Sequence, residues 1–266
     1  MKLFLRNSIR KNNIKLFCEK IKDDFCFTQK SVLLEKDNTE NIVPMNDSVV
    51  LEKQSLNKKM KTQWKNISEL SKFKLCLLNS SVSIATYAFY ATTQTTLDYL
   101  LFGAGTLFIS MNTQVLNQII EKLYDKQMKR TNSRPLPKQR ISDNAAKIIS
   151  ASLWVLSSAC YYPTCPNAIF FSNGILFLYI LGYTPLKRIN NLSMHVGAIV
   201  GALPALLGSF AATGMLFPEE SLLLAAYILA WQYPHFYGIL YQNKEDYKKA
   251  GFKEIRTEIQ QRRLME

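Results

Sequence analysis

The sequence lacks several patterns that mark common classes of protein. Its five cysteines are odd in number and show no metal-ligand spacing, which argues against a zinc site and against a disulfide framework. The net charge of +13 would suit a nucleic-acid-binding protein, but no basic recognition helix or stacked aromatic motif accompanies it. We therefore attribute the charge to membrane topology and to anion binding.

Acidic residues are absent before Glu19, and no apolar segment of secretory length occurs in this region. The same stretch carries five cations interleaved with apolar residues: Lys2, Arg6, Arg10, Lys11 and Lys15. This pattern is typical of a mitochondrial targeting sequence, and an ordinary basic tail is the alternative. We expect a presequence over residues 1–25 and a weakly ordered polar segment over residues 26–72, rich in Lys, Asn, Asp and Glu.

From Leu75 onward the sequence is strongly apolar. Six stretches lie near the ~20 residues needed to cross a ~30 Å hydrocarbon core. They are residues 75–94, 98–118, 146–163, 167–183, 193–217 and 221–241. Lys and Arg are absent from alternate loops, whereas the intervening loops and both flanks are basic. This is the positive-inside pattern, and the alternative, a soluble helical bundle, has no reason to sort charge in this way. The sequence predicts an all-α, polytopic membrane bundle over residues 73–266.

Acidic and amide side chains stand where the second apolar stretch ends. Asn117, Glu121 and Asp125 are four residues apart, a spacing that places them on one face of a helix. Ionisable groups inside a membrane are costly and usually functional. Mg²⁺ binds one or two carboxylates and takes its other ligands from water and substrate phosphates. The pattern predicts a Mg²⁺-diphosphate site, and a solvated surface helix is the alternative.

Cations follow these acidic residues and recur after the fourth apolar stretch. We expect Arg130 and Arg134 one turn apart on a continuing helix that stops at Pro135, where their guanidinium groups would contact phosphate oxygens. Lys187 and Arg188 are expected on the same side of the membrane. They either clamp the same diphosphate or anchor a helix end by snorkelling.

Two further residues carry open alternatives. His235 follows a proline near the end of the sixth apolar stretch, where it would bind a haem-like ligand, carry a proton or bond to a neighbouring carbonyl. Asp246, in the basic segment beyond that stretch, either completes a second metal site or lies in a solvated loop.

Taken together and in this order, these elements resemble the protoheme IX farnesyltransferases, or haem O synthases, of the UbiA superfamily of intramembrane prenyltransferases. The likeness covers roughly residues 70–254 and is closest to the mitochondrial branch. It is carried by Leu70–Lys74, Asn117–Leu136, Tyr183–Arg188, Gly197–Pro204, Trp231–Phe236 and Asp246–Gly251.

The resemblance implies a helical bundle that joins farnesyl diphosphate to the vinyl group of haem B, giving haem O for cytochrome c oxidase. It implies Mg²⁺ as cofactor, the mitochondrial inner membrane as location, matrix-facing basic loops, and homo-oligomers or oxidase-assembly factors as partners. The residues implied to bind Mg²⁺ are Asn117, Glu121, Asp125 and Asp246. Those implied to act on the leaving diphosphate are Arg130, Lys187 and Arg188. Those implied to bind substrate are Lys72, Arg134, Tyr183, Trp231, His235 and Asp246.

Three departures from the family's pattern stand out. The family usually has nine membrane helices, whereas this sequence offers six, so we expect a bundle truncated at its C-terminal end. Gln114 stands where relatives often have Asn, and Ser193-Met194-His195 where they tend to have Asn-Thr-Trp. The alternative functions are a prenyltransferase acting on a quinone-precursor ring and a truncated, non-catalytic membrane protein.

Overall fold

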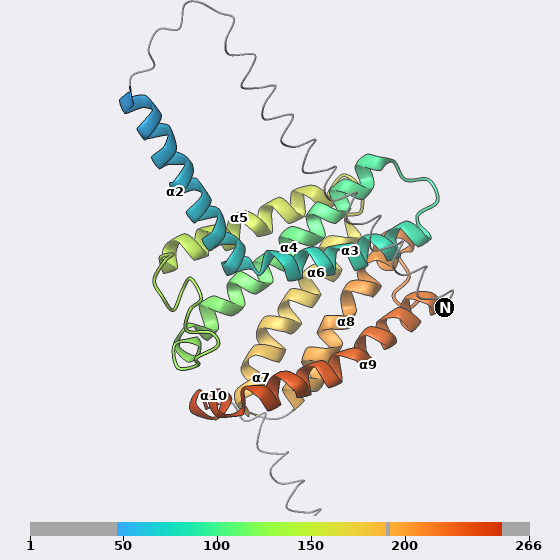
Figure 1. Ribbon diagram of the computed structural model, residues 1–266. Helices are drawn as coiled ribbons and strands as arrows, with labels where there is room; N and C mark the ends of the chain where they lie inside the picture. Colours follow the sequence, from blue (N-terminus) through green and yellow to red (C-terminus); the bar gives the residue numbers. More distant parts are fainter. Residues whose placement is uncertain (1–46, 190–191, 252–266) are drawn as a thin grey trace, which may run out of the picture. The chain divides into compact units, whose positions relative to one another are not determined.

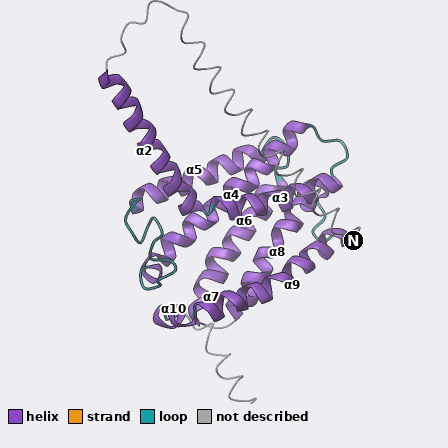
Figure 2. Cartoon of the chain, in the orientation of Figure 1, coloured by secondary structure: helices purple, strands orange, loops and turns teal. Residues whose placement is uncertain are grey.

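The computed structural model describes residues 47–189 and 192–251, and every regular element within these ranges is helical (Figures 1 and 2). The elements are α2 (Asp47–Ser71), α3 (Phe73–Tyr90), α4 (Thr96–Asp125), α5 (Asp143–Tyr161), α6 (Asn167–Phe177), the π-helix η1 (Leu178–Tyr183), α7 (Thr184–Ile189), α8 (Leu192–Thr213), α9 (Glu219–Gln242) and α10 (Lys244–Lys249). The chain divides into two compact units, Met1–Lys59 and Met60–Glu266, and the bundle belongs to the second. The expected presequence lies outside the described residues.

Helix α2 occupies part of the segment for which the sequence predicts weak order. Residues 47–71 are rich in Lys, Glu, Gln, Leu and Met, which favour helix, and contain no Gly or Pro. Its side chains from residue 55 to residue 65 are exposed. The polar composition predicts weak order because few of these side chains could be buried. It does not account for their high helix propensity, which favours the observed helix.

Local sequence sets where the helices begin. Thr95 and Asp98 form a capping box at the start of α4: the Thr95 amide donates to Asp98 Oδ2 at 2.8 Å, and the Asp98 amide donates to Thr95 Oγ1 at 3.4 Å. Ser142 caps α5 by accepting a hydrogen bond from the Ala145 amide at 3.2 Å. Lys72 separates α2 from α3 with a left-handed backbone, φ 49°.

The bundle is built on two central helices. Helix α4 packs against α3 and α5, and α8 packs against α3 and α9 (Figure 1). At the contact of α3 with α8, a Cβ on Gly208 would overlap the Ser83 carbonyl, so only glycine permits this approach. Close backbone approach at small residues is characteristic of helix packing in membranes.

Hydroxyl groups also join neighbouring helices. Ser80 of α3 donates to the Gly103 carbonyl of α4 at 2.8 Å, and Ser157 of α5 donates to the Gly105 carbonyl at 2.8 Å. The Ser83 hydroxyl also donates to the Pro204 carbonyl of α8 at 2.7 Å. Such bonds hold helices together where lipid offers no hydrophobic driving force.

Large apolar side chains cover the outside of the bundle, including Phe170, Leu223 and Leu100, which are 79%, 75% and 66% exposed. Within the described ranges, three helical segments are long and apolar enough to cross a membrane: Thr96–Asp125, Asn167–Ile189 and Leu192–Thr213. The other predicted stretches correspond to helices α3, α5 and α9. The prediction of an all-helical membrane bundle is confirmed.

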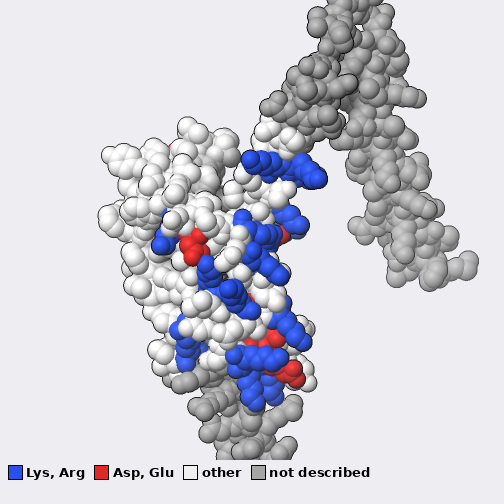
Figure 3. All heavy atoms as spheres, turned by 90° about the vertical axis from the view of Figure 1, so that its left-hand side faces the viewer, with Lys and Arg blue, Asp and Glu red and all other residues white. Residues whose placement is uncertain are grey.

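Charged residues are unevenly distributed over the surface of the bundle. On the face that Figure 3 shows, Lys and Arg side chains gather over one part, while another part is almost free of charge. An uneven distribution is expected where basic and uncharged loops alternate.

Candidate active site

The last two turns of α4 bring together the three residues that the sequence singled out. The exposed fractions of Asn117, Glu121 and Asp125 are only 1%, 7% and 3%, and the three side chains share the face that the four-residue spacing predicts. The Asn117 amide nitrogen donates to Glu121 Oε2 at 2.9 Å. Two carboxylates are therefore held at a helix end within an apolar bundle, where each needs a compensating charge.

A separate cation compensates each carboxylate. Lys187 Nζ lies 2.7 Å from Glu121 Oε1, and Arg134 Nη1 lies 2.6 Å from Asp125 Oδ2. All four side chains are mostly buried, so both ion pairs are shielded from solvent. The cluster consequently contains oxygens for a metal and cations for an anion, paired with one another.

Lys72 adds a further positive charge from the junction of α2 and α3. Burial lowers the pKa of Lys72 to about 8; the neighbouring Arg134 and Lys187 also lower it, while Glu121 and Asp125 oppose the shift. Its φ of 49° is unusual for a residue other than glycine, and such strain is often found at functional positions. The excess positive charge around Lys72 favours an anionic ligand.

The prediction that Arg130 and Arg134 lie on a continuing helix is wrong. Helix α4 ends at Asp125, and residues 126–142 form successive turns packed onto the bundle. The Thr131 hydroxyl donates to the Asp125 carbonyl at 3.1 Å, which satisfies a group left open at the helix end and turns the chain. Arg134 is thereby brought back to Asp125, whereas Arg130 is exposed.

The Arg130 region instead meets α10. Its backbone amide donates to Asp246 Oδ2 at 3.2 Å, and its guanidinium donates to the Tyr247 hydroxyl at 3.1 Å. Asp246 is only 9% exposed, so it does not lie in a solvated loop. The α4–α5 loop therefore connects Asp246 of α10 with the acidic residues at the end of α4.

Lys187 and Arg188, predicted to act as a pair, point to different places. Lys187 reaches Glu121 and lies over the Tyr183 ring, with Nζ 4.2 Å from the ring centroid. The Arg188 guanidinium lies 3.5 Å from the centroid of the Tyr124 ring, on the exposed side of the cluster. The π-helix η1 precedes them, and π-turns of this kind are frequent at functional sites.

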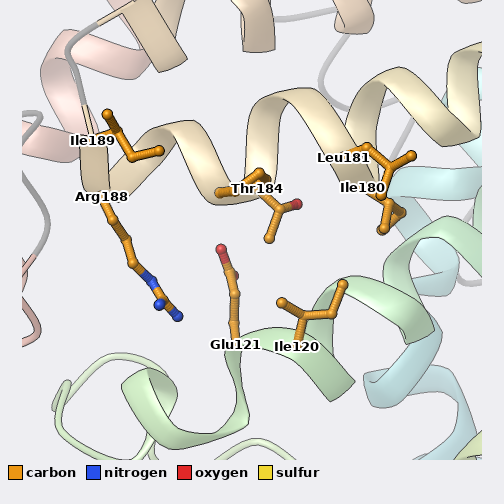
Figure 4. Close-up of a pocket in the computed structure, with 8 residues that line it drawn as sticks. Ile120, Glu121, Ile180, Leu181, Thr184, Arg188 and Ile189 are labelled. Carbon is orange, nitrogen blue, oxygen red and sulfur yellow. The ribbon is translucent and has the colours of Figure 1, made fainter.

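Sequence reasoning missed Thr184. Its hydroxyl donates to Asn117 Oδ1 at 3.2 Å and to the Tyr179 carbonyl at 3.0 Å, so it links η1 to the acidic face of α4 (Figure 4). Its position in the sequence, as a polar residue between Tyr183 and the Lys187-Arg188 pair, could have identified Thr184 as a candidate site residue. Glycine at position 197 leaves room for the Tyr183 ring, which would stand 2.6 Å from a Cβ there.

Comparison with known proteins places these residues in a family. The model described as the UbiA prenyltransferase family matches residues 80–265, which include the acidic face of α4, the α4–α5 loop and α7. The chain belongs to the UbiA prenyltransferase family.

Similar members of the UbiA family include proteins named protoheme IX farnesyltransferase. The one from Cytophaga hutchinsonii is 36% identical over 204 residues, covering 74% of this chain and 70% of that protein. The mitochondrial proteins of Arabidopsis thaliana and Homo sapiens are 40% and 31% identical, over 56% and 83% of this chain. The matches span only 35% and 53% of their own lengths.

Two solved structures share the fold. A UbiA homolog from Archaeoglobus fulgidus, bound to DMAPP and Mg²⁺, matches with a TM-score of 0.58 and 16% identity, over 71% of this chain and 67% of that one. A digeranylgeranylglyceryl phosphate synthase matches with the same TM-score and 22% identity, over 71% and 66%. At these identities the likeness establishes the UbiA fold.

The contacts of the α9 residues Trp231 and His235 are with each other rather than with the ion pairs. Their rings stack on each other, with centroids 4.9 Å apart, and both side chains are exposed. Gln232 between them points inward and donates to the Ala198 carbonyl at 3.2 Å. A role for Trp231 and His235 in substrate binding stays a prediction.

The donor set suits a hard divalent cation that shares its ligands with a substrate. In residues 47–189 and 192–251, no three His, Cys, Asp or Glu side chains form a group that could hold a metal by themselves. Glu121 and Asp125 nevertheless supply carboxylate oxygens and Asn117 an amide oxygen. Phosphate oxygens would complete such a site, as is usual for Mg²⁺.

Proposed function

We propose that this chain transfers the farnesyl group of farnesyl diphosphate to a vinyl group of protohaem IX, haem B, and so forms haem O. The observation that carries the proposal is the buried cluster in which Asn117, Glu121 and Asp125 face Lys187 and Arg134. The names of the UbiA relatives, including mitochondrial ones, support the choice of substrates.

Asn117, Glu121 and Asp125 would hold Mg²⁺ together with the diphosphate. The Mg²⁺ and DMAPP bound to the Archaeoglobus fulgidus homolog support this assignment. When bound, Mg²⁺ would offset the negative charge that develops on the diphosphate. Asp246, bonded to the Arg130 amide, is proposed to position the α4–α5 loop and to serve as a further metal ligand.

The cations of the cluster act on the leaving group. Lys187 and Arg134 would exchange Glu121 and Asp125 for phosphate oxygens when the diphosphate binds, which would leave both carboxylates available to hold Mg²⁺. As the carbon–oxygen bond of the substrate breaks, the electron pair leaves with the diphosphate and these cations stabilise it. Lys72, Arg130 and Arg188 are proposed to add positive charge around the same group.

The apolar bundle protects the second half of the reaction. The farnesyl carbon, now an allylic cation, accepts the electron pair of the vinyl carbon of haem B. Water then adds to the cation formed on the haem side chain and loses a proton, which leaves a hydroxyethylfarnesyl group. Premature contact with water would destroy the allylic cation, so the cavity must exclude it. Tyr183, Trp231 and His235 are proposed substrate contacts.

We further propose that the protein resides in the mitochondrial inner membrane with its basic loops in the matrix. The uneven distribution of charge on the bundle and the mitochondrial relatives support this location. The division into a presequence (1–25), a polar segment (26–72) and a membrane domain (73–266), and association with a second copy or with oxidase-assembly factors, belong to the same proposal.

Expression in cells that lack haem O synthase tests the activity. We expect haem O in the extracted haems, its loss in Asp125→Asn, and its retention in Asp143→Asn, which changes an exposed carboxylate outside the cluster. Haem B alone, despite membrane insertion of the unmodified chain, would refute the catalytic proposal. An unchanged yield with Asp125→Asn would refute the role of the cluster.

A further inference from the structure

Helix α2 carries an exposed row of large apolar side chains. Met60 and Trp64 are one turn apart on the same side of the helix, and their side chains are 60% and 62% exposed. The same four-residue spacing reaches Leu56, which is 50% exposed. Trp64 meets the Phe73 ring edge-on, with centroids 6.0 Å apart, and this contact leaves most of its side chain uncovered. We call Leu56, Met60 and Trp64 the apolar stripe of α2.

A different side of α2 attaches the end of this helix to the bundle. Arg140 of the α4–α5 loop donates to Asn66 Oδ1 at 2.8 Å and to Glu69 Oε2 at 2.6 Å. The Leu70 side chain is completely buried. At about 100° per residue, the three α2 residues point roughly 120–160° away from Trp64 around the helix axis. The attachment to the bundle therefore leaves the side of Trp64 open.

Lysines border the apolar stripe. At about 100° per residue, Lys61 points roughly 60° to one side of Trp64, and Lys59 points roughly 60° beyond Leu56 on the other side. Both lysines are exposed, as is Lys65. The sequence contains no Asp or Glu between residues 53 and 68, so this surface attracts anions. Lysine stems can lie along an apolar layer while their ammonium groups reach charged groups around it.

The place of α2 in the chain is next to the hydrocarbon core. Helix α2 ends at Ser71, and α3, which begins at Phe73, contains most of the first predicted apolar stretch. The left-handed backbone of Lys72, φ 49°, interrupts the helix between them, so α2 can leave the direction of α3. The lysines of α2 make a membrane-spanning position costly. The location that suits both of its faces is the interface between lipid and water.

We propose that α2 lies in the membrane interface and binds anionic phospholipid, with the apolar stripe inserted below the headgroups and the bordering lysines on lipid phosphates. Helices with an aromatic and aliphatic face and a lysine-rich polar face bind membranes in this way, and anionic lipid strengthens the binding. A second copy of α2 would bring like charges together, whereas an anionic lipid surface neutralises them. The proposal adds a peripheral attachment to the membrane-spanning bundle and does not depend on the reaction.

Quenching of Trp64 fluorescence by lipid tests the proposal. The chain has three tryptophans, so the full chain with Trp154→Phe and Trp231→Phe reports on Trp64 alone. It is placed in nanodiscs of phosphatidylcholine with brominated acyl chains, with or without phosphatidylglycerol as the anionic lipid. We expect strong quenching and blue-shifted emission in the anionic nanodiscs, and loss of both when residues 59, 61 and 65 are changed from Lys to Gln.

A matched control moves the indole to the other side of the helix. Thr62 is exposed and points roughly 160° away from Trp64. In the same background, Thr62→Trp combined with Trp64→Phe should remain open to acrylamide in water and respond weakly to the brominated lipid. If the background does not fold, fluorine NMR of the fluorotryptophan-labelled chain with a paramagnetic lipid gives the same information, because Trp64→Phe identifies the signal.

Each contrary outcome overturns the proposal. Equal quenching at positions 62 and 64 would show that α2 has no preferred face toward the lipid. Equal quenching of Trp64 with and without phosphatidylglycerol, or no effect of the lysine changes, would remove the role of anionic lipid. Protection of Trp64 from acrylamide without quenching by brominated lipid would identify a protein partner instead.

Discussion

Replacement of Lys187 by Met removes one partner of a buried ion pair and preserves much of the side-chain volume. In the unmodified chain the side chains of Lys187 and Glu121 are only 12% and 9% exposed, and their charged atoms are 2.7 Å apart. After the substitution the Asn117 amide, 2.9 Å from Glu121 Oε2, would still donate to the Glu121 carboxylate. Breaking such a pair typically costs about 3–5 kcal/mol.

We expect Lys187→Met to destabilise the fold by about 3 kcal/mol, at the low end of this range because Asn117 still donates to Glu121. For a bundle of this size that loss lowers the melting temperature by roughly 6–12 °C. The double variant Glu121→Gln, Lys187→Met contains neither charge and should recover most of the stability. The assay is thermal unfolding in detergent, with the four variants arranged as a double-mutant cycle.

The chain supplies a matched control at its surface. Lys122 and Asp143 are also 2.7 Å apart, but their side chains are 23% and 52% exposed. Because solvent screens this pair, Lys122→Met should cost less than about 1 kcal/mol. If Lys187→Met proves no more harmful than Lys122→Met, or the double variant is no more stable than the single ones, the assignment of Lys187 as the compensating charge for Glu121 is wrong.

Three further predictions follow from the cluster and the packing. Mg²⁺ and diphosphate should bind cooperatively, because either alone would leave buried charges unpaired; calorimetry that finds equal affinity for diphosphate with and without Mg²⁺ would contradict this. Affinity for Mg²⁺-diphosphate should fall as the pH rises above 8, where Lys72 loses its proton, and Lys72→Arg should remove that decline; binding measured from pH 6.5 to 9.5 decides. Gly208→Ala should destabilise the bundle by about 1–3 kcal/mol through overlap with α3, whereas Gly238→Ala, with open space around it, should not.

Periodicity and charge placement predicted the helical architecture and the acidic face, because both follow from local regularities. Asn117, Glu121 and Asp125 share a face for the simple reason that a helix repeats every 3.6 residues. The conformation of residues 126–142 could not be obtained in this way. It depends on the Thr131 bond to the end of α4 and on the long-range bond of the Arg130 amide to Asp246.

The different directions of the Lys187 and Arg188 side chains also could not be predicted from the sequence. Adjacent residues on a helix point about 100° apart, so the two side chains leave the backbone in different directions. Which one faces Glu121 depends on the backbone that precedes them, and no composition rule identifies a π-turn in advance. The same holds for Thr184, whose partner on α4 lies far away along the chain.

The winding of the π-helix η1 determines the direction in which Lys187 points. Its wider turn accommodates an additional residue compared with ordinary helical winding. If the same residues were wound as an ordinary helix, everything downstream would rotate by about 100°. The lysine would then swing away from its carboxylate although no residue of the cluster had been altered. The π-turn therefore determines whether Lys187 reaches its carboxylate as directly as the choice of residue at position 187 does.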